Sequence, residues 1–346
     1  HIGLSLSTAD WHWLITLGNP AGFIADAAPD NGQWLVDEDY NGIYKFRSEN
    51  IREYFRWLNR MYHEGILDPD FATQTHEDYI AKIASGRVIA LTDADWDYAD
   101  GERILKADGK YEQTYAPLPL TMYEEQKAPS LMYQGLTTGY GIGISVNAED
   151  PVAAIKFLDY IASDEGQVLV QWGIEGVNYT IQDGKRVRNE ADIIGSQSDP
   201  DYIERTGVGF HNYPFPSYGN GIEDATGNTY TTTNRESVMN EYDVEQQAAV
   251  EAWGVDLLTE IFPQPDEFET PPFSAIWAYA KPPEFDEIST RLDEIAWSAL
   301  VSLTIDAEAN FDANYDKLVH DLESAGMTRA EELLTEILAE KIELMN

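Results

Sequence analysis

The chain has 346 residues, of which 43% are apolar and 24% are charged, as expected for a globular protein of about two domains. Its 62 acidic and 22 basic residues give a formal net charge of −40, which repels phosphate backbones and excludes nucleic acid as a partner. The absence of cysteine excludes disulfides, thiolate nucleophiles, zinc fingers and iron–sulfur clusters, and there is no apolar run long enough to span a bilayer.

The first hundred or so residues predict loops followed by alternating helices and strands. Residues 1–35 combine aromatic residues with Gly, Asn and Pro, which is typical of loops, and residues 37–46 predict a hairpin with Asn41-Gly42 at its turn. Apolar residues at spacings of 3 and 4 predict a helix from Ser48 to Gly65. A helix over 76–85, a buried strand over 87–92 and an acidic, aromatic loop over 93–98 follow.

The remaining two thirds predict mostly helices. Residues 140–146 alternate large and small side chains like a strand, and Asp150-Pro151 is a typical helix start. Further helices are expected from Asp164 to Trp172 and over 234–252, 284–302 and 311–326. A strand is expected over 178–182, with Asp183-Gly184 as its turn. Thr328 and Glu331 predict a capping box for a final helix. The fold class is therefore α/β.

The sequence lacks a recognisable catalytic or metal motif. Its six histidines form no paired metal-binding spacing, and Asp37, Asp39 and Asn41 resemble a calcium loop in which Ser48 stands where the bidentate Glu is needed. We therefore predict a plain hairpin without a metal, and no cofactor. A glycoside hydrolase would need a pair of carboxyl groups, and the acidic residues around Trp96 offer one; among 62 acids, such neighbours arise by chance.

Four stretches resemble one family of binding proteins. They are residues 62–71 (YHEGILDPDF), 84–91 leading to Trp96, 140–167 with the strand-like segment and the Asp150-Pro151 helix, and 172–185 (WGIEGVNYTIQDGK). Together they resemble the extracellular solute-binding proteins (family 1) of bacterial carbohydrate ABC importers. The nearest subgroup is that of LipO-like lipoproteins, which is itself similar to the periplasmic alginate-binding proteins.

This resemblance implies a two-lobe, type II periplasmic-binding-protein-like architecture that closes over its ligand. The bounds it implies are 1–135 for the first part of lobe two, 136–208 for part of lobe one, and 209–346 for the return into lobe two with C-terminal helices. The chain then corresponds to about the C-terminal two-thirds of such a protein. Lobe one is incomplete, and residues 136–208 are expected to lack partner strands.

The resemblance also implies a function without catalysis. The protein would capture a carbohydrate, namely a neutral oligosaccharide, between its lobes and deliver it to the transmembrane permease subunits of an ABC transporter. We expect an extracellular monomer that is anchored at the cell surface by a lipid outside this chain, or a periplasmic one. The alternatives are a glycoside hydrolase or other carbohydrate-processing enzyme, and a binding protein for a peptide or other non-sugar solute.

The ligand-binding residues expected from the resemblance are mostly aromatic, because flat rings cover the apolar faces of sugars. Trp96 is the expected stacking platform, with Asp95 and Asp97 as acceptors for sugar hydroxyls. Tyr179 lies in a stretch that resembles a cleft-edge loop, although packing at a strand end is an equal alternative. The other candidates are His211 and Tyr213, where the chain returns to lobe two, and Trp34, one of three early tryptophans that could line the cleft.

Overall fold

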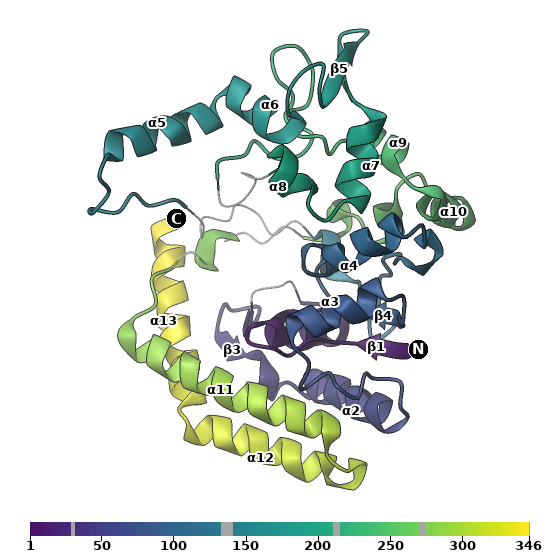
Figure 1. Ribbon diagram of the computed structural model, residues 1–346. Coiled ribbons are helices and arrows are strands. Elements are labelled where there is room, and N and C mark those ends of the chain that lie inside the picture. The colour runs from purple at the N-terminus through teal and green to yellow at the C-terminus, as the bar shows by residue number, and fades with distance from the viewer. Residues whose placement is uncertain (29–31, 133–140, 210–214, 270–273, 278, 346) are drawn as a thin grey trace. The chain divides into compact units, whose positions relative to one another are not determined.

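The computed structural model of the protein describes all residues except 29–31, 133–140, 210–214, 270–273, 278 and 346 (Figure 1). Contacts within the chain divide it into two compact units. Unit 1 comprises residues 1–99, 117–139 and 260–346, and unit 2 comprises residues 100–116 and 140–259. Unit 2 thus includes residues 209–259, which the resemblance assigns to the return into lobe two. The lobe bounds rest on the resemblance and not on contacts, and they stay a prediction.

Unit 1 combines two small sheets with long helices. Its strands are β1 (Ile2–Ser5), β2 (Trp34–Val36), β3 (Gly42–Tyr44) and β4 (Val88–Leu91). Its helices are α1 (Asn19–Ala21), α2 (Glu49–His63), α3 (His76–Ala84), α11 (Pro283–Ile305), α12 (Phe311–Ser324) and α13 (Met327–Met345), while α4 (Asp95–Ala107) begins in unit 1 and continues into unit 2. β1 pairs in parallel with β4, and β2 pairs antiparallel with β3.

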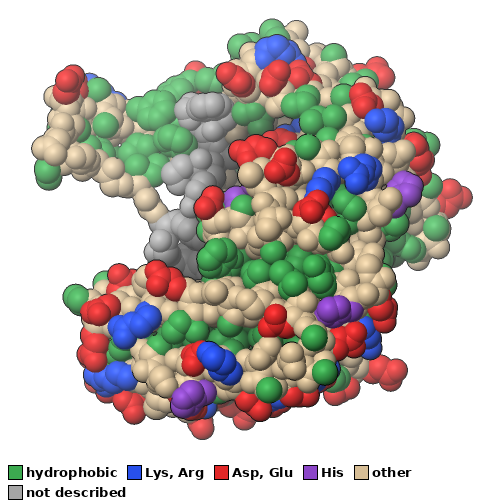
Figure 2. Space-filling view, turned by 60° about the horizontal axis from the view of Figure 1, so that its bottom comes forward, with side chains coloured by type: hydrophobic (Ala, Val, Ile, Leu, Met, Phe, Trp, Pro, Cys, Tyr) green, Lys and Arg blue, Asp and Glu red, His purple; other side chains and the backbone are tan. Residues whose placement is uncertain are grey.

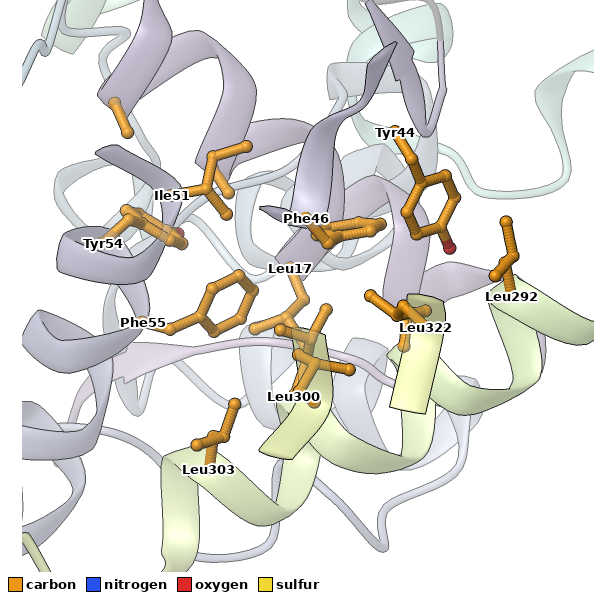
Figure 3. Packing of buried hydrophobic residues seen from close by; sticks show 14 of the residues in the cluster. Leu17, Tyr44, Phe46, Ile51, Tyr54, Phe55, Leu292, Leu300, Leu303 and Leu322 are labelled. Carbon is orange, nitrogen blue, oxygen red and sulfur yellow. The ribbon is translucent and has the colours of Figure 1, made fainter. Parts of the chain in front are cut away.

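The main core of unit 1 lies between α2 and the C-terminal helices. The predicted apolar stripe of α2 is confirmed, because Ile51, Tyr54, Phe55 and Leu58 are all fully or almost fully buried. Figure 3 shows this stripe facing leucines of α11 and α12, together with Tyr44 at the end of β3 and Phe46 just after it. Full burial of each such side chain stabilises the fold by about 1.5–3 kcal/mol.

A buried amide joins α2 to the end of α11. Asn59 donates from Nδ2 to the carbonyl oxygens of Leu303 and Asp306, at 2.8 Å and 2.7 Å. The last carbonyls of a helix have no partner within the helix, and here a side chain of another helix supplies one. Asn59 therefore fixes how α2 and α11 meet.

The predicted capping box at the start of α13 is wrong. The helix already begins at Met327, so Thr328 lies inside it and does not cap it. Glu331 instead accepts a hydrogen bond from the backbone N–H of Tyr44 at 3.0 Å and pairs with Arg47 at 2.7 Å. Its carboxylate therefore joins α13 to the β2–β3 hairpin. The spacing of Thr328 and Glu331 matches a capping box, but Glu331 makes this long-range contact instead.

A hairpin is present, but its predicted turn is wrong, because Gly42 belongs to β3 and the turn lies before it. Residues 37–41 form the turn between β2 and β3. The carboxylate of Asp37 accepts hydrogen bonds from the backbone N–H groups of Asp39 and Asn41 and from the Asn41 side chain, which lowers its pKa. Gly42 is needed because a Cβ there would lie 2.7 Å from the side chain of Leu334.

Unit 2 consists of short helices and one hairpin. Besides the larger part of α4, its helices are α5 (Pro151–Ala162), α6 (Asp164–Trp172), α7 (Glu190–Ser198), α8 (Tyr202–Thr206), α9 (Arg235–Glu241) and α10 (Val244–Trp253). Its strands β5 (Tyr179–Gln182) and β6 (Lys185–Arg188) pair antiparallel, as the predicted Asp183-Gly184 turn requires. The predicted N-cap of α5 is confirmed, since Asp150 accepts a hydrogen bond from the backbone N–H of Ala153. The helix expected over 234–252 is interrupted, because Asp243 caps a new helix, α10.

A further prediction in unit 2 is wrong. Residues 141–146 form no strand, and Ile142, Ile144 and Val146 are exposed. In α5 the only buried residue is Ile161, and green side chains remain visible along this helix in Figure 2, at the upper left. An alternating sequence becomes a strand only where a neighbouring strand pairs with it, and none of the described strands pairs with 141–146.

No helix in the described part of the chain combines the length and the apolar composition needed to cross a membrane.

A buried carboxyl group in unit 1 gives a testable dependence of stability on pH. Asp293 of α11 accepts hydrogen bonds from the Tyr44 hydroxyl at 2.9 Å and from Gln33, and burial raises its pKa to about 6. The folded state therefore binds this proton more tightly than the unfolded state. The resulting stabilisation is complete below about pH 4 and is lost, by about 3 kcal/mol, as the pH rises through 6.

We expect Asp293→Asn to remove this dependence, because the amide stays neutral. Relative to the original protein, the variant should gain about 3 kcal/mol between pH 4 and pH 7 in urea unfolding. Glu294→Gln removes a charge from the exposed neighbouring position and serves as the control. If the difference in the free energy of unfolding between Asp293→Asn and the original protein stays constant over this range, the pKa of Asp293 is not raised in the folded state.

Candidate functional site

Two exposed tryptophans of unit 1 form one aromatic surface. The rings of Trp11 and Trp96 are stacked, with centroids 6.1 Å apart and an angle of 21° between their planes. Trp11 is 53% exposed and Trp96 is 61% exposed. Large exposed aromatic surface is unfavourable in water, so this tryptophan pair is a surface on which a ligand with an apolar face would gain free energy.

The parallel pairing of β1 with β4 brings the tryptophan pair together. Both strands run in the same direction, so the segments that follow them, with Trp11 and Trp96, leave the same edge of the sheet. Ligands of α/β proteins commonly lie outside the carboxyl ends of such strands. The predicted loop over 93–98 is partly wrong, because α4 begins at Asp95 and holds Trp96 in its first turn.

A cluster of two histidines and one aspartate lies directly beneath the tryptophan pair. The Nε2 atoms of His12 and His76 lie 3.5 Å and 3.6 Å from Oδ1 of Asp97, whose side chain is 5% exposed. The two imidazole rings are stacked, with centroids 4.2 Å apart, and Trp11 stacks on His12. We call these three residues the His–Asp cluster.

A fourth ionisable group adjoins this cluster. Asp93 accepts hydrogen bonds from the Tyr79 hydroxyl at 2.8 Å and from the backbone N–H of Ala94. Burial, and then the neighbouring charge of Asp97, raise the pKa of Asp93 to about 7. Both burial and a neighbouring negative charge disfavour the ionised form of a carboxyl group.

The structure places the predicted site residues in different surroundings. Trp96 and Asp95 are exposed at the start of α4, whereas Asp97 is turned inward to the histidines. Trp34 is 4% exposed and packs edge-on against Tyr44, so its rings offer no surface to a ligand. This burial argues against the ligand role proposed for Trp34.

The remaining predicted site residues are Tyr179, His211 and Tyr213. Tyr179 is 7% exposed and packs edge-on against Trp172, which corresponds to the alternative of packing at a strand end. His211 and Tyr213 lie outside the described residues. The structure therefore brings together Trp96, Asp95 and Asp97 but adds neither Trp34 nor Tyr179 to them.

Sequence reasoning missed His12 and His76 as members of the site and left Trp11 as one of three possible tryptophans. The signal that could have found them is the pairing of residues 2–5 with the strand at 88–91, because parallel neighbours place their following segments side by side. Two surface hollows of unit 1, one of about 460 Å³ along α3 and one of about 510 Å³ between α11 and α12, have no aromatic residue in their lining. Neither hollow offers the stacking surface of the tryptophan pair.

Comparison with known proteins relates part of the chain to one family. Residues 9–168, which contain the tryptophan pair and the His–Asp cluster, match the sequence profile described as bacterial extracellular solute-binding protein. This part of the chain is therefore similar to that family. The proteins of the family and the solved structures that resemble the chain are binding proteins and not enzymes, and the predicted lack of catalysis agrees with them.

Several solved solute-binding proteins share the fold. The alginate-binding protein AlgQ2 is 14% identical with a TM-score of 0.56, and the alignment covers 98% of this chain and 64% of AlgQ2. FusA of S. pneumoniae, solved with kestose, is 12% identical with a TM-score of 0.58, covering 98% and 63% of the two chains. An HMO-binding, ABC-transporter-associated protein of Bifidobacterium longum infantis is 14% identical with a TM-score of 0.54, covering 98% and 64%. The predicted periplasmic-binding-protein-like fold is confirmed.

One further relative is similar to part of the chain. An uncharacterised protein of Niallia circulans, encoded in the 5′ region of butB, is 28% identical over 134 residues, which is 38% of this chain and 51% of the relative. The chain thus spans about half the length of that relative and less than two thirds of each solved structure described above.

Proposed function

We propose that the protein captures a neutral oligosaccharide outside the cytoplasm and delivers it to the membrane permease of an ABC importer. The observation that carries this proposal is the exposed tryptophan pair at the carboxyl edge of the β1–β4 sheet. The solved relatives support a carbohydrate as the ligand, because AlgQ2 is an alginate-binding protein, FusA was solved with kestose, and the Bifidobacterium protein binds HMO.

The tryptophan pair suits the chemistry of a sugar. A pyranose ring has an apolar face of C–H groups, which an indole covers, and a rim of hydroxyl groups, which need acceptors and donors. Asp95, exposed beside Trp96, offers carboxylate oxygens to such hydroxyls. Trp96 and Asp95 therefore remain in the proposed site, and Trp11 joins them.

Charge favours a neutral ligand over a uronate polymer. The net charge of −40 raises the free energy of any polyanion near the protein, and acidic side chains are spread over the face shown in Figure 2. Asp10 and Asp95, which are exposed next to Trp11 and Trp96 in the chain, would repel a carboxylate. An uncharged oligosaccharide does not meet this repulsion.

A thermal-unfolding screen tests the proposal. We expect neutral oligosaccharides to raise the unfolding temperature, because a ligand at 100 times its Kd stabilises the folded state by about 2.7 kcal/mol. Uronate oligomers and peptides of similar size form the comparison arms. Stabilisation by peptides alone would favour the peptide-binding alternative, and stabilisation by uronates alone would contradict the argument from charge.

A further inference from the structure

We propose that the His–Asp cluster of His12, His76 and Asp97 is a binding site for a divalent transition-metal ion, with Zn²⁺ as its best-suited occupant. Each of the three residues contributes a ligand atom, and these atoms all lie within 4.8 Å of one another. In the part of the chain that the structure describes, this is the group with such an arrangement of ligand atoms.

The separations within the cluster fit a metal better than they fit hydrogen bonds. The 3.5 Å and 3.6 Å between the imidazole Nε2 atoms and Asp97 Oδ1 are too long for good hydrogen bonds. Ligands at 2.0–2.1 Å around a tetrahedral Zn²⁺ lie about 3.4 Å from one another. The carboxylate and each imidazole are therefore spaced nearly as two ligands of one ion.

The hydrogen bonding of His12 leaves Nε2 free to coordinate. Its Nδ1 lies 2.9 Å from the backbone carbonyl oxygen of Ala9, which accepts hydrogen bonds and cannot donate them. Nδ1 therefore carries the proton, and the lone pair of the neutral ring is on Nε2, the atom that faces Asp97. Histidine ligands of metals are commonly oriented by such a bond from the other ring nitrogen.

An unsatisfied carboxylate oxygen supplies an independent indication. Among the described residues, Asp97 Oδ2 is buried without a hydrogen-bond partner. The side chain of Asp97 is 5% exposed, and leaving a carboxylate there without compensation is unfavourable. A bound cation would supply the missing charge, and the 29% exposure of His76 gives an ion access from solvent.

The donor set selects the class of metal. Two imidazoles and one carboxylate suit Zn²⁺ and its neighbours in the transition series, whereas Ca²⁺ and Mg²⁺ prefer oxygen ligands. Both stacked imidazoles present Nε2 to the same carboxylate oxygen, so a small rotation of each ring would direct the two nitrogen atoms to a common point. Because His12 and Asp97 directly follow Trp11 and Trp96 in the chain, the ion would also hold the backbone at both tryptophans.

Calorimetric titration of the chelator-treated protein with Zn²⁺, at a salt concentration that screens the acidic surface, tests the inference. We expect one tight site per chain, with Mg²⁺ and Ca²⁺ unable to compete. His76→Gln and Asp97→Asn should each weaken Zn²⁺ binding by about ten- to a hundred-fold or more. His320→Gln, the same change at an exposed histidine of α12, should leave Zn²⁺ binding unchanged.

Circular dichroism without metal shows whether each variant is folded, and His12→Gln replaces any variant that is not. Replacing Zn²⁺ by Co²⁺ gives a second readout, since His76→Gln should remove the visible absorption of the bound Co²⁺. The inference is overturned if Zn²⁺ does not bind. It is equally overturned if Zn²⁺ binds with the same affinity to His76→Gln and Asp97→Asn as to the original protein, because the ion would then occupy the acidic surface.

Discussion

Replacement of Phe55 by Ala is expected to lower the free energy of unfolding by about 3–5 kcal/mol. Phe55 is fully buried in the stripe of α2, where its ring stands edge-on to Tyr54 and faces leucines of α11 (Figure 3). Removing the ring loses its transfer from water and leaves a cavity that the surrounding long helices cannot easily fill. For a protein with a typical stability of about 5–15 kcal/mol, this is a large share.

Urea unfolding followed by circular dichroism measures this effect. The midpoint should fall while the slope of the transition stays nearly constant, because the surface exposed on unfolding hardly changes. Arg60→Ala, at an exposed position of the same helix, should change the stability by less than about 0.5 kcal/mol. A loss below 1 kcal/mol for Phe55→Ala would mean that the α2–α11 interface is not the main core of unit 1.

Replacement of Trp96 by Ala is expected to weaken sugar binding by about ten- to a hundred-fold, by analogy with the stacking of bases on aromatic side chains. The side chain is 61% exposed, so its removal leaves a smaller cavity than a core substitution and the fold should persist. It also removes half of the tryptophan pair. Trp11→Ala should weaken binding for the same reason, because both indoles belong to one surface.

Calorimetry with the oligosaccharide that binds best measures this loss. Trp297→Ala is the matched control, since Trp297 is 42% exposed on α11 and lies outside the proposed site. Its sugar affinity should equal that of the original protein. Unchanged affinity in Trp96→Ala, with both variants folded, would place the sugar elsewhere on the molecule.

Local signals in the sequence predicted most helices and both hairpins. The spacing of apolar residues in α2, the Asp150 cap of α5 and the Asp183-Gly184 turn each act within a few residues, so the sequence alone contains the information. Residues 141–146 show where this fails. Their alternation is that of a strand, but a strand also needs a partner, which is a property of the whole fold.

The candidate site depends on contacts between distant parts of the chain, and only part of it was predictable. Trp96 was identified because it follows the predicted strand over 87–92, yet Trp34 looked as suitable as Trp11 from composition alone. Pairing with Tyr44 buries Trp34, whereas the parallel strands β1 and β4 bring Trp11 to Trp96. The same pairing joins His12 to Asp97, across a separation that no local spacing reveals.

Titration of the protein with neutral oligosaccharides of increasing length, followed by analysis of the recovered sugar, tests the central proposal most directly. We expect saturable binding of one molecule per chain to at least one such sugar, and its recovery at its original length. Recovery of shortened sugar would indicate a glycoside hydrolase. If no neutral sugar binds, while a peptide or a uronate does, capture of a neutral oligosaccharide is contradicted.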